Sequence, residues 1–281
     1  MSHTMINEED WEITPQFKRD NWEDEPIRLF VGTSETFDRH PEQIYLYSIL
    51  KNTDHPVEVT WLRPSMFPDW TRKGWGTPFT CFRYAIPEMC NFKGRALYTD
   101  CDMINFRDIQ HLWRTDLKGK PFGMVWDALQ MNSDKFRGTE HERGWWCDSV
   151  MLIDCEKAKE YIHPIKEQAK WPTTYKWDFM AGIGSPFKEK SQKIVQELDA
   201  RWNSFDGADT AYPYTRPYPM DDKVQLDLEE IWQVHLTALS YQPWHPKYSP
   251  HAKASHKRQD IMEVYWKYSR ELKTLEKLGE I

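Results

Sequence analysis

Glycine is scarce in this chain, and its scarcity removes two common ways of holding phosphate. Only 12 of the 281 residues are glycine, below the usual share of about 7%. Neither Gly-x-Gly-x-x-Gly nor Gly-x-x-x-x-Gly-Lys-Ser/Thr occurs, so nothing supports a dinucleotide-binding fingerprint or a P-loop. A phosphate group bound by this protein would therefore need a metal ion or side chains.

Excess positive charge and long apolar runs are also missing. Lys and Arg number 37 against 44 Asp and Glu, a net charge of −7, so the chain lacks the basic character of proteins that bind nucleic acid. The chain contains no run of about 18 apolar residues, so no membrane span is predicted. The segment Met1 to Asp24 is acidic rather than basic and then apolar, so we expect no cleavable signal peptide and a cytoplasmic protein.

Cysteine is present but not in the patterns of a disulfide framework or a zinc ribbon. The five cysteines contain no Cys-x-x-Cys pair. Their odd number favours reduced thiols. They are Cys81, Cys90, Cys101, Cys147 and Cys155.

Segments typical of strands and helices alternate along most of the chain. Expected strands are Ile27–Gly32, Val57–Leu62, Arg95–Thr99, Pro121–Trp126, Ser149–Asp154 and Ile231–Thr237. Expected helices are Pro41–Leu50, Phe79–Cys90, Asp108–Trp113, Glu156–Lys170, Phe187–Ala200 and Gln259–Leu278. This alternation predicts an α/β fold with a mainly parallel central sheet flanked by helices. We expect residues 1–26 to form an N-terminal arm, 27–245 a single domain, and 246–281 a tail that is basic at first and then helical.

Two aspartates follow one of the expected strands. Asp100 and Asp102 stand at i and i+2 where the strand Arg95–Thr99 ends, so both side chains leave the same face and can meet one divalent cation. Ligands bind beyond the carboxyl ends of strands in open α/β sheets. Taken alone the pair is a weak signal, because short patterns of this kind often arise by chance.

Five stretches of the sequence, one of which contains this pair, together form a recognisable pattern. They are Phe82–Glu88, Gly94–Ile104 with Asp100-Cys101-Asp102, Ser149–Asp154, Arg201–Asn203, and Val234–Thr237 followed by Gln242-Pro243-Trp244. In order and spacing they resemble the glycosyltransferases of family 8, over about residues 27–245. The resemblance implies a GT-A fold, which is a Rossmann-like α/β domain.

The resemblance also implies an activity and a metal site. It implies a retaining glycosyltransferase that moves a hexose from a nucleotide diphosphate sugar, with a UDP-sugar as the expected donor, to an acceptor hydroxyl on a saccharide or another molecule. It places the metal on Asp100, Asp102 and His235. Hard oxygen ligands suit Mg²⁺ or Mn²⁺, and an imidazole favours Mn²⁺. The cation would neutralise the departing diphosphate.

Further candidate residues come from the same resemblance and from positions next to its motifs. Candidate donor contacts are Val31, Gly32, Thr33, Arg83, Asp100, Cys101, Thr237, Gln242 and Lys247. Candidate catalytic residues are Asp127, Asp148 and Asp178. From the residues alone, His235 also fits a buried structural histidine, Arg83 a solvated helix charge, and Asp127 a loop cap.

Two departures from the family pattern keep other functions open. Cys147-Asp148-Ser149 stands where the family commonly has Asn-Ser-Gly, and Gln242 stands where a lysine usually precedes Pro-Trp, with Lys247 close by. These changes motivate an alternative, a nucleotide-sugar binding protein that transfers poorly. A sugar-1-phosphate nucleotidyltransferase is a weaker interpretation, because Gly32-Thr33-Ser34-Glu35 is not a glycine-rich basic loop.

Overall fold

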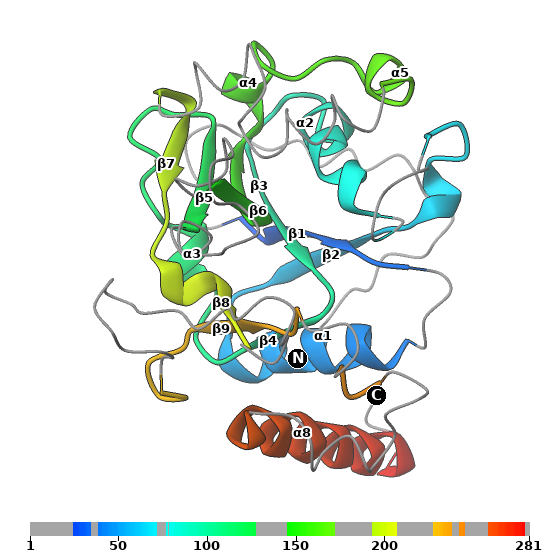
Figure 1. Cartoon of the computed structure of the whole chain (residues 1–281), viewed down its shortest axis with the longest axis vertical. Coiled ribbons are helices and arrows are strands. Elements are labelled where there is room, and N and C mark those ends of the chain that lie inside the picture. The colour runs from blue at the N-terminus through cyan, green and yellow to red at the C-terminus, as the bar shows by residue number, and fades with distance from the viewer. Residues whose placement is uncertain are drawn as a thin grey trace, which may run out of the picture.

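A six-stranded sheet carries the fold in a computed structural model, which describes residues 25–34, 39–71, 77, 79–127, 145–171, 193–206, 227–237, 242–244 and 258–278 (Figure 1). The strands are β1 (Ile27–Gly32), β2 (Val57–Leu62), β3 (Arg95–Asp100), β4 (Met103–Asn105), β5 (Phe122–Asp127), β6 (Trp145–Asp154), β7 (Val195–Glu197), β8 (Ser204–Phe205) and β9 (Gln233–His235). The α-helices are α1 (His40–Asn52), α2 (Ile86–Met89), α3 (Gln110–Trp113), α4 (Cys155–Ala158), α5 (Ile165–Gln168) and α8 (Gln259–Leu278). Short 3-10 helices are η1 (Pro64–Met66), η2 (Thr80–Ala85) and η5 (Ala200–Asn203).

The main sheet has the strand order β2-β1-β3-β6-β5-β7. Strand β1 pairs in parallel with β2 and β3, and β5 pairs in parallel with β7. Strand β6 is antiparallel to both β3 and β5, so it alone runs against the others. The mainly parallel α/β sheet expected from the sequence is confirmed. A second, three-stranded sheet has the order β4-β9-β8.

The central strands of the main sheet, such as β1 and β3, are buried on both faces, as their apolar sequences predict. Successive side chains of a strand point to opposite faces. In β1, Phe30 joins one hydrophobic cluster, whereas Ile27, Leu29 and Val31 join the other. Each face is therefore covered by its own set of helices and loops.

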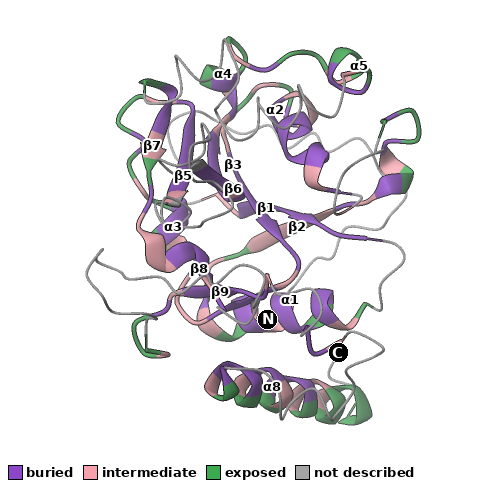
Figure 2. Cartoon of the chain, viewed as in Figure 1, coloured by how far each residue is buried: buried purple, intermediate pink, exposed green. Residues whose placement is uncertain are grey.

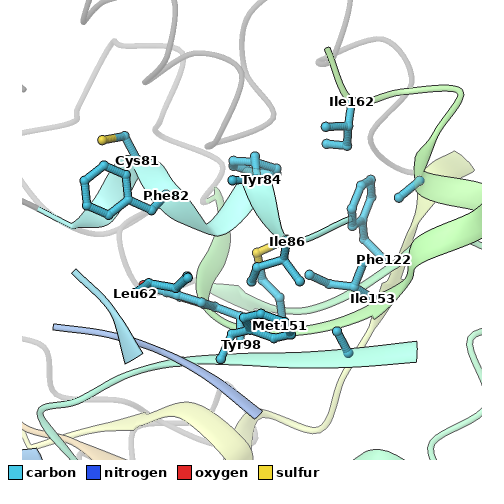
Figure 3. Packing of buried hydrophobic residues seen from close by; sticks show 14 of the residues in the cluster. Leu62, Cys81, Phe82, Tyr84, Ile86, Tyr98, Phe122, Met151, Ile153 and Ile162 are labelled. Atoms are coloured by element: carbon cyan, nitrogen blue, oxygen red, sulfur yellow. The ribbon is translucent and has the colours of Figure 1, made fainter. Parts of the chain in front are cut away.

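Aromatic and branched side chains fill the first of these clusters. Figure 3 shows residues of η2 and α2 packed over the side chains of β3, β5 and β6. The labelled side chains are Leu62, Cys81, Phe82, Tyr84, Ile86, Tyr98, Phe122, Met151, Ile153 and Ile162. Tyr98 belongs to this layer, which places its hydroxyl near the end of β3.

The C-terminal helix α8 packs on α1 (Figure 1). A third cluster joins Ile44 of α1, Val234 of β9, and Ile261 and Tyr265 of α8. Figure 2 shows that the side of α8 facing α1 is buried and that the opposite side is exposed. The helix expected at Gln259–Leu278 is confirmed. Among the residues that the structure describes, no helix is apolar and long enough to cross a membrane.

Two expected helices are wrong. Residues 156–170 do not form one helix: α4 and α5 are separate single turns, because Pro164 cannot continue a helix begun before it. Within the expected helix Phe187–Ala200, Val195–Glu197 is instead the strand β7, which pairs with β5. Pairing at the sheet edge overrides the local periodicity there. Residues 187–192 lie outside the described residues.

Candidate metal and donor site

The two sheets meet at the carboxyl end of β3 and bring the three expected metal ligands together. Asp100 is the last residue of β3, and Asp102 stands just before β4. Strand β4 pairs antiparallel with β9, with Met103 opposite His235. One ligand atom from each of Asp100, Asp102 and His235 lies within 4.8 Å of the others. Segments more than 130 residues apart in sequence thus build one cluster.

The contacts within this cluster fit a divalent cation. His235 Nε2 lies 3.2 Å from Asp102 Oδ1 and 3.9 Å from Asp100 Oδ2. Asp102 Oδ1 is buried, and the described residues offer it no hydrogen-bond partner apart from the His235 ring. A buried carboxylate oxygen of this kind needs a partner. Two carboxylates and an imidazole form a donor set suited to Mn²⁺ or Mg²⁺.

The imidazole of His235 is held from behind by Asn203. The ring atom Nδ1 lies 3.2 Å from Asn203 Oδ1, and Asn203 Nδ2 donates to Ser149 Oγ over 2.9 Å. A carbonyl oxygen only accepts, so Nδ1 carries the hydrogen and Nε2 faces the aspartates. In the sequence, Asn203 stands within Arg201-Trp202-Asn203, a pattern that by itself predicts no role for it. The available signal was its place in one of the stretches that carry the family resemblance.

Burial and neighbouring charge shift the titration of the cluster. Burial opposes protonation of His235, but Asp102 and Asp100 outweigh it, so the pKa of His235 is raised. Burial also raises the pKa of Asp100, although Arg83 opposes this shift. A cation bound by these groups would compete with protons for them.

Arg83 lies beneath the cluster rather than on the surface. Its Nη1 donates to Asp148 Oδ1 over 2.6 Å and its Nη2 to Asp100 Oδ1 over 3.1 Å. The guanidinium stands 4.6 Å from the centre of the Tyr98 ring, and the Tyr98 hydroxyl donates to Asp100. The side chain of Arg83 is only 2% exposed. The interpretation of Arg83 as a solvated helix charge is thus wrong. A contact of Arg83 with a donor stays a prediction.

Asp148 extends this charge network. It belongs to β6, and burial raises the pKa of Asp148 to about 6 although Arg83 opposes the shift. The carboxylate stands where the family pattern has a neutral residue. It therefore adds negative charge next to Arg83 and Asp100.

Gln242 and Thr237 lie next to Asp102 and His235. Gln242 Nε2 donates to Asp102 Oδ2 over 3.0 Å and to the carbonyl of Leu236 over 2.8 Å. Thr237 Oγ1 donates to Asp206 Oδ1 over 3.2 Å. Gln242 therefore contacts Asp102, and the backbone N–H of Thr237 donates to the carbonyl of His235 over 3.0 Å. Binding of either residue to a donor stays a prediction.

The end of β1 lies directly beside Asp100. Gly32 pairs with Asp100, and the backbone N–H of Cys101 donates to the carbonyl of Gly32 over 3.1 Å. A Cβ on Gly32 would approach the Phe79 ring to 2.7 Å and collide with the Tyr98 hydroxyl, so only glycine fits there. The close approach of these backbones explains why this glycine is present in a glycine-poor chain.

The side chains of the other β1 candidates are enclosed. Val31 packs in the second hydrophobic cluster, the Thr33 hydroxyl donates to Glu42, and Cys101 is buried. Donor contacts of Val31, Gly32, Thr33 and Cys101 stay predictions.

The remaining candidates are placed only in part. Asp127 ends β5 and pairs with Trp145 of β6, but its side chain is not described. Asp178 and Lys247 lie outside the described residues. The five cysteines, by contrast, are all described, and each is a buried free thiol.

Comparison with solved structures identifies the fold as that of glycosyltransferases. The galactosyltransferase LgtC, solved with donor and acceptor sugar analogs, is 13% identical with a TM-score of 0.54, over 86% of this chain and 96% of that chain. GlyE of Streptococcus pneumoniae is 18% identical with a TM-score of 0.54, over 87% of this chain and 61% of that chain. Mouse xyloside xylosyltransferase 1 is 13% identical with a TM-score of 0.51, over 76% of this chain and 99% of that chain.

Sequence comparison identifies the family. The profile of glycosyl transferase family 8 matches residues 71–246, so the chain belongs to that family. Protein CDI of Arabidopsis thaliana is 30% identical over 152 residues, which are 49% of this chain and 56% of that protein. The chain thus spans about half the length of this curated relative. The family and the fold expected from the sequence are confirmed.

Proposed function

We propose that this protein is a metal-dependent, retaining glycosyltransferase that moves a hexose from a UDP-sugar to an acceptor hydroxyl. The observation that carries the proposal is the cluster of Asp100, Asp102 and His235. It lies at the carboxyl end of β3 in a chain of glycosyl transferase family 8. Ligands of open α/β sheets bind at that end of the strands.

The metal ligands support the reaction through leaving-group chemistry. Asp100, Asp102 and His235 would hold Mn²⁺, or else Mg²⁺. Such a cation stabilises the negative charge of a departing diphosphate. Because these side chains are largely buried, their interactions with charge are stronger than they would be in water.

Candidates that lie near this cluster are assigned to the donor. Gly32 and Cys101 adjoin Asp100, and we assign the donor to this end of β1. Asp127, Asp148 and Asp178 stay candidates for the sugar side of the site. The donor and acceptor sugar analogs bound by LgtC support a nucleotide-sugar donor and a saccharide or other hydroxyl acceptor here. The five free thiols support a cytoplasmic location.

A nucleotide-sugar panel tests the proposal. The protein is incubated with each sugar nucleotide and either Mn²⁺ or EDTA, and released nucleoside diphosphate is measured. We expect release with UDP-hexoses and Mn²⁺, and almost none with EDTA. Asp102→Asn should abolish the Mn²⁺-dependent release, because it removes a charged ligand.

The matched control is Asp69→Asn, at an exposed aspartate of the described chain, which should behave like the unchanged protein. Undiminished release by Asp102→Asn would contradict the metal assignment. Binding of UDP with no release from any donor would favour the non-transferring alternative.

A further inference from the structure

Gln242 is tied to a metal ligand by both hydrogens of its amide nitrogen. Nε2 donates to Asp102 Oδ2 over 3.0 Å and to the Leu236 carbonyl over 2.8 Å. Leu236 in turn donates its backbone N–H to the carbonyl of Asp102 over 2.8 Å. Gln242 is 4% exposed, so this arrangement is shielded from water.

The two oxygens of Asp102 therefore have different surroundings. Oδ2 accepts the Gln242 hydrogen bond, whereas Oδ1 faces the His235 ring, with Nε2 3.2 Å away. The terminal torsion of an aspartate is broad and turns easily when nothing holds it. A donor on one oxygen fixes the plane of the carboxylate and keeps the other oxygen aimed at the cation position.

We propose that Gln242 is a positioning residue that holds Asp102 toward His235 and so sets the affinity of the cluster for a divalent cation. The inference rests on the proposed function, because it concerns the same metal site. It reassigns Gln242, which the sequence predicted to contact the donor. Partners that orient metal ligands in this way typically change metal affinity by about 10- to 100-fold when they are removed.

An uncharged donor suits this task. The Gln242 amide donates a hydrogen bond without cancelling the charge of Asp102. A lysine at the same position would form an ion pair with Asp102 and compete with a cation for it. The charge of the side chain at this position is therefore expected to act on metal affinity directly.

The test compares Gln242→Met and Gln242→Lys with the unchanged protein, using Mn²⁺ alone as the probe, without nucleotide. Mn²⁺ affinity is measured by titration calorimetry, and the bound ion by electron paramagnetic resonance. We expect about tenfold weaker Mn²⁺ binding in Gln242→Met and a larger loss in Gln242→Lys. Gln43→Met, at an exposed glutamine of α1, is the matched control and should bind Mn²⁺ normally.

The melting temperature of each protein, measured without metal, shows whether a loss of Mn²⁺ affinity comes from a loss of folding rather than from a misplaced Asp102. If Gln242→Met does not fold, Gln242→Lys carries the test, because a lysine ammonium can donate to the Leu236 carbonyl in place of the amide. Unchanged Mn²⁺ affinity in both variants, with Asp102→Asn still abolishing binding, would overturn this inference and leave the proposed function standing. Tighter uridine diphosphate binding by Gln242→Lys at unchanged Mn²⁺ affinity would also overturn it. No Mn²⁺ binding by the unchanged protein would overturn both.

Discussion

At the scale of single residues, Asn203 determines which nitrogen of His235 faces the aspartates. Its Oδ1 lies 3.2 Å from His235 Nδ1. We predict that Asn203→Leu weakens Mn²⁺ binding by about 10- to 100-fold, because the ring loses the acceptor that fixes its orientation. Titration calorimetry with Mn²⁺ measures the effect.

Ser149→Ala is the control for this change. It removes the partner of Asn203 Nδ2 and leaves the acceptor for His235 in place. The predicted order of Mn²⁺ affinities is therefore the unchanged protein, then Ser149→Ala, then Asn203→Leu. Equal affinities for Asn203→Leu and Ser149→Ala would mean that Asn203 contributes packing and not orientation.

The raised pKa of Asp148 leads us to predict that the free energy of unfolding depends on pH. Burial raises its pKa to about 6, above the ordinary value of about 3.9. A carboxyl whose pKa is raised by folding destabilises the protein when it is ionised, so the free energy of unfolding falls as the pH rises from about 4 to 6. Asp148→Asn removes this dependence.

The stability of Asp148→Asn relative to the unchanged protein should therefore improve by about 3 kcal/mol between pH 4 and pH 7.5, since one pKa unit corresponds to 1.36 kcal/mol. Urea unfolding at both pH values measures this difference. A constant difference would show that the charge of Asp148 is fully compensated by Arg83, 2.6 Å away.

At the scale of elements, α8 is attached to the rest of the chain by its buried face. Ile261 is completely buried in the cluster that α8 shares with α1 and β9. We predict that Ile261→Ala lowers the free energy of unfolding by about 3 kcal/mol, because it leaves a cavity in a packed interface. Chemical unfolding measures the loss, and hydrogen exchange locates it.

Leu278 provides a control on the same helix. Its side chain is 65% exposed, so Leu278→Ala should change the stability by no more than about 0.5 kcal/mol. Faster hydrogen exchange in both α8 and α1 is expected for Ile261→Ala alone. Exchange confined to α8 would show that α1 is stable without this contact.

At the scale of the whole molecule, the sequence predicts those strands and helices whose own residues carry a recognisable pattern. Strands such as β1 and β3 carry apolar runs long enough to be recognised, and α8 has a clear helical period. Short strands such as β7 and β8 carry no such signal, because their pairing partners lie far away in the sequence. Local pattern therefore predicted the main sheet but not its β7 edge.

The candidate site also contains residues that the sequence predicted and contacts that it did not. Asp100 and Asp102 are close in sequence and follow a recognisable strand, whereas His235 was expected only from the family resemblance. The bonds from Asn203 to His235 and from Gln242 to Asp102 depend on side-chain positions that no spacing specifies. The cluster of Asp100, Asp102 and His235 was thus predicted, and the contacts that Asn203 and Gln242 make with it were not.

Metal binding should be visible in the stability of the whole chain. A ligand that binds only the folded state stabilises it by about 2.7 kcal/mol at 100 times its dissociation constant. For a chain of 281 residues this corresponds to a rise in melting temperature of about 5 °C. We predict such a rise with Mn²⁺, a smaller one with the same concentration of Mg²⁺ because of the imidazole of His235, and reversal by EDTA. Asp102→Asn should show no rise, and an equal rise in that variant would place the stabilising ion elsewhere on the molecule.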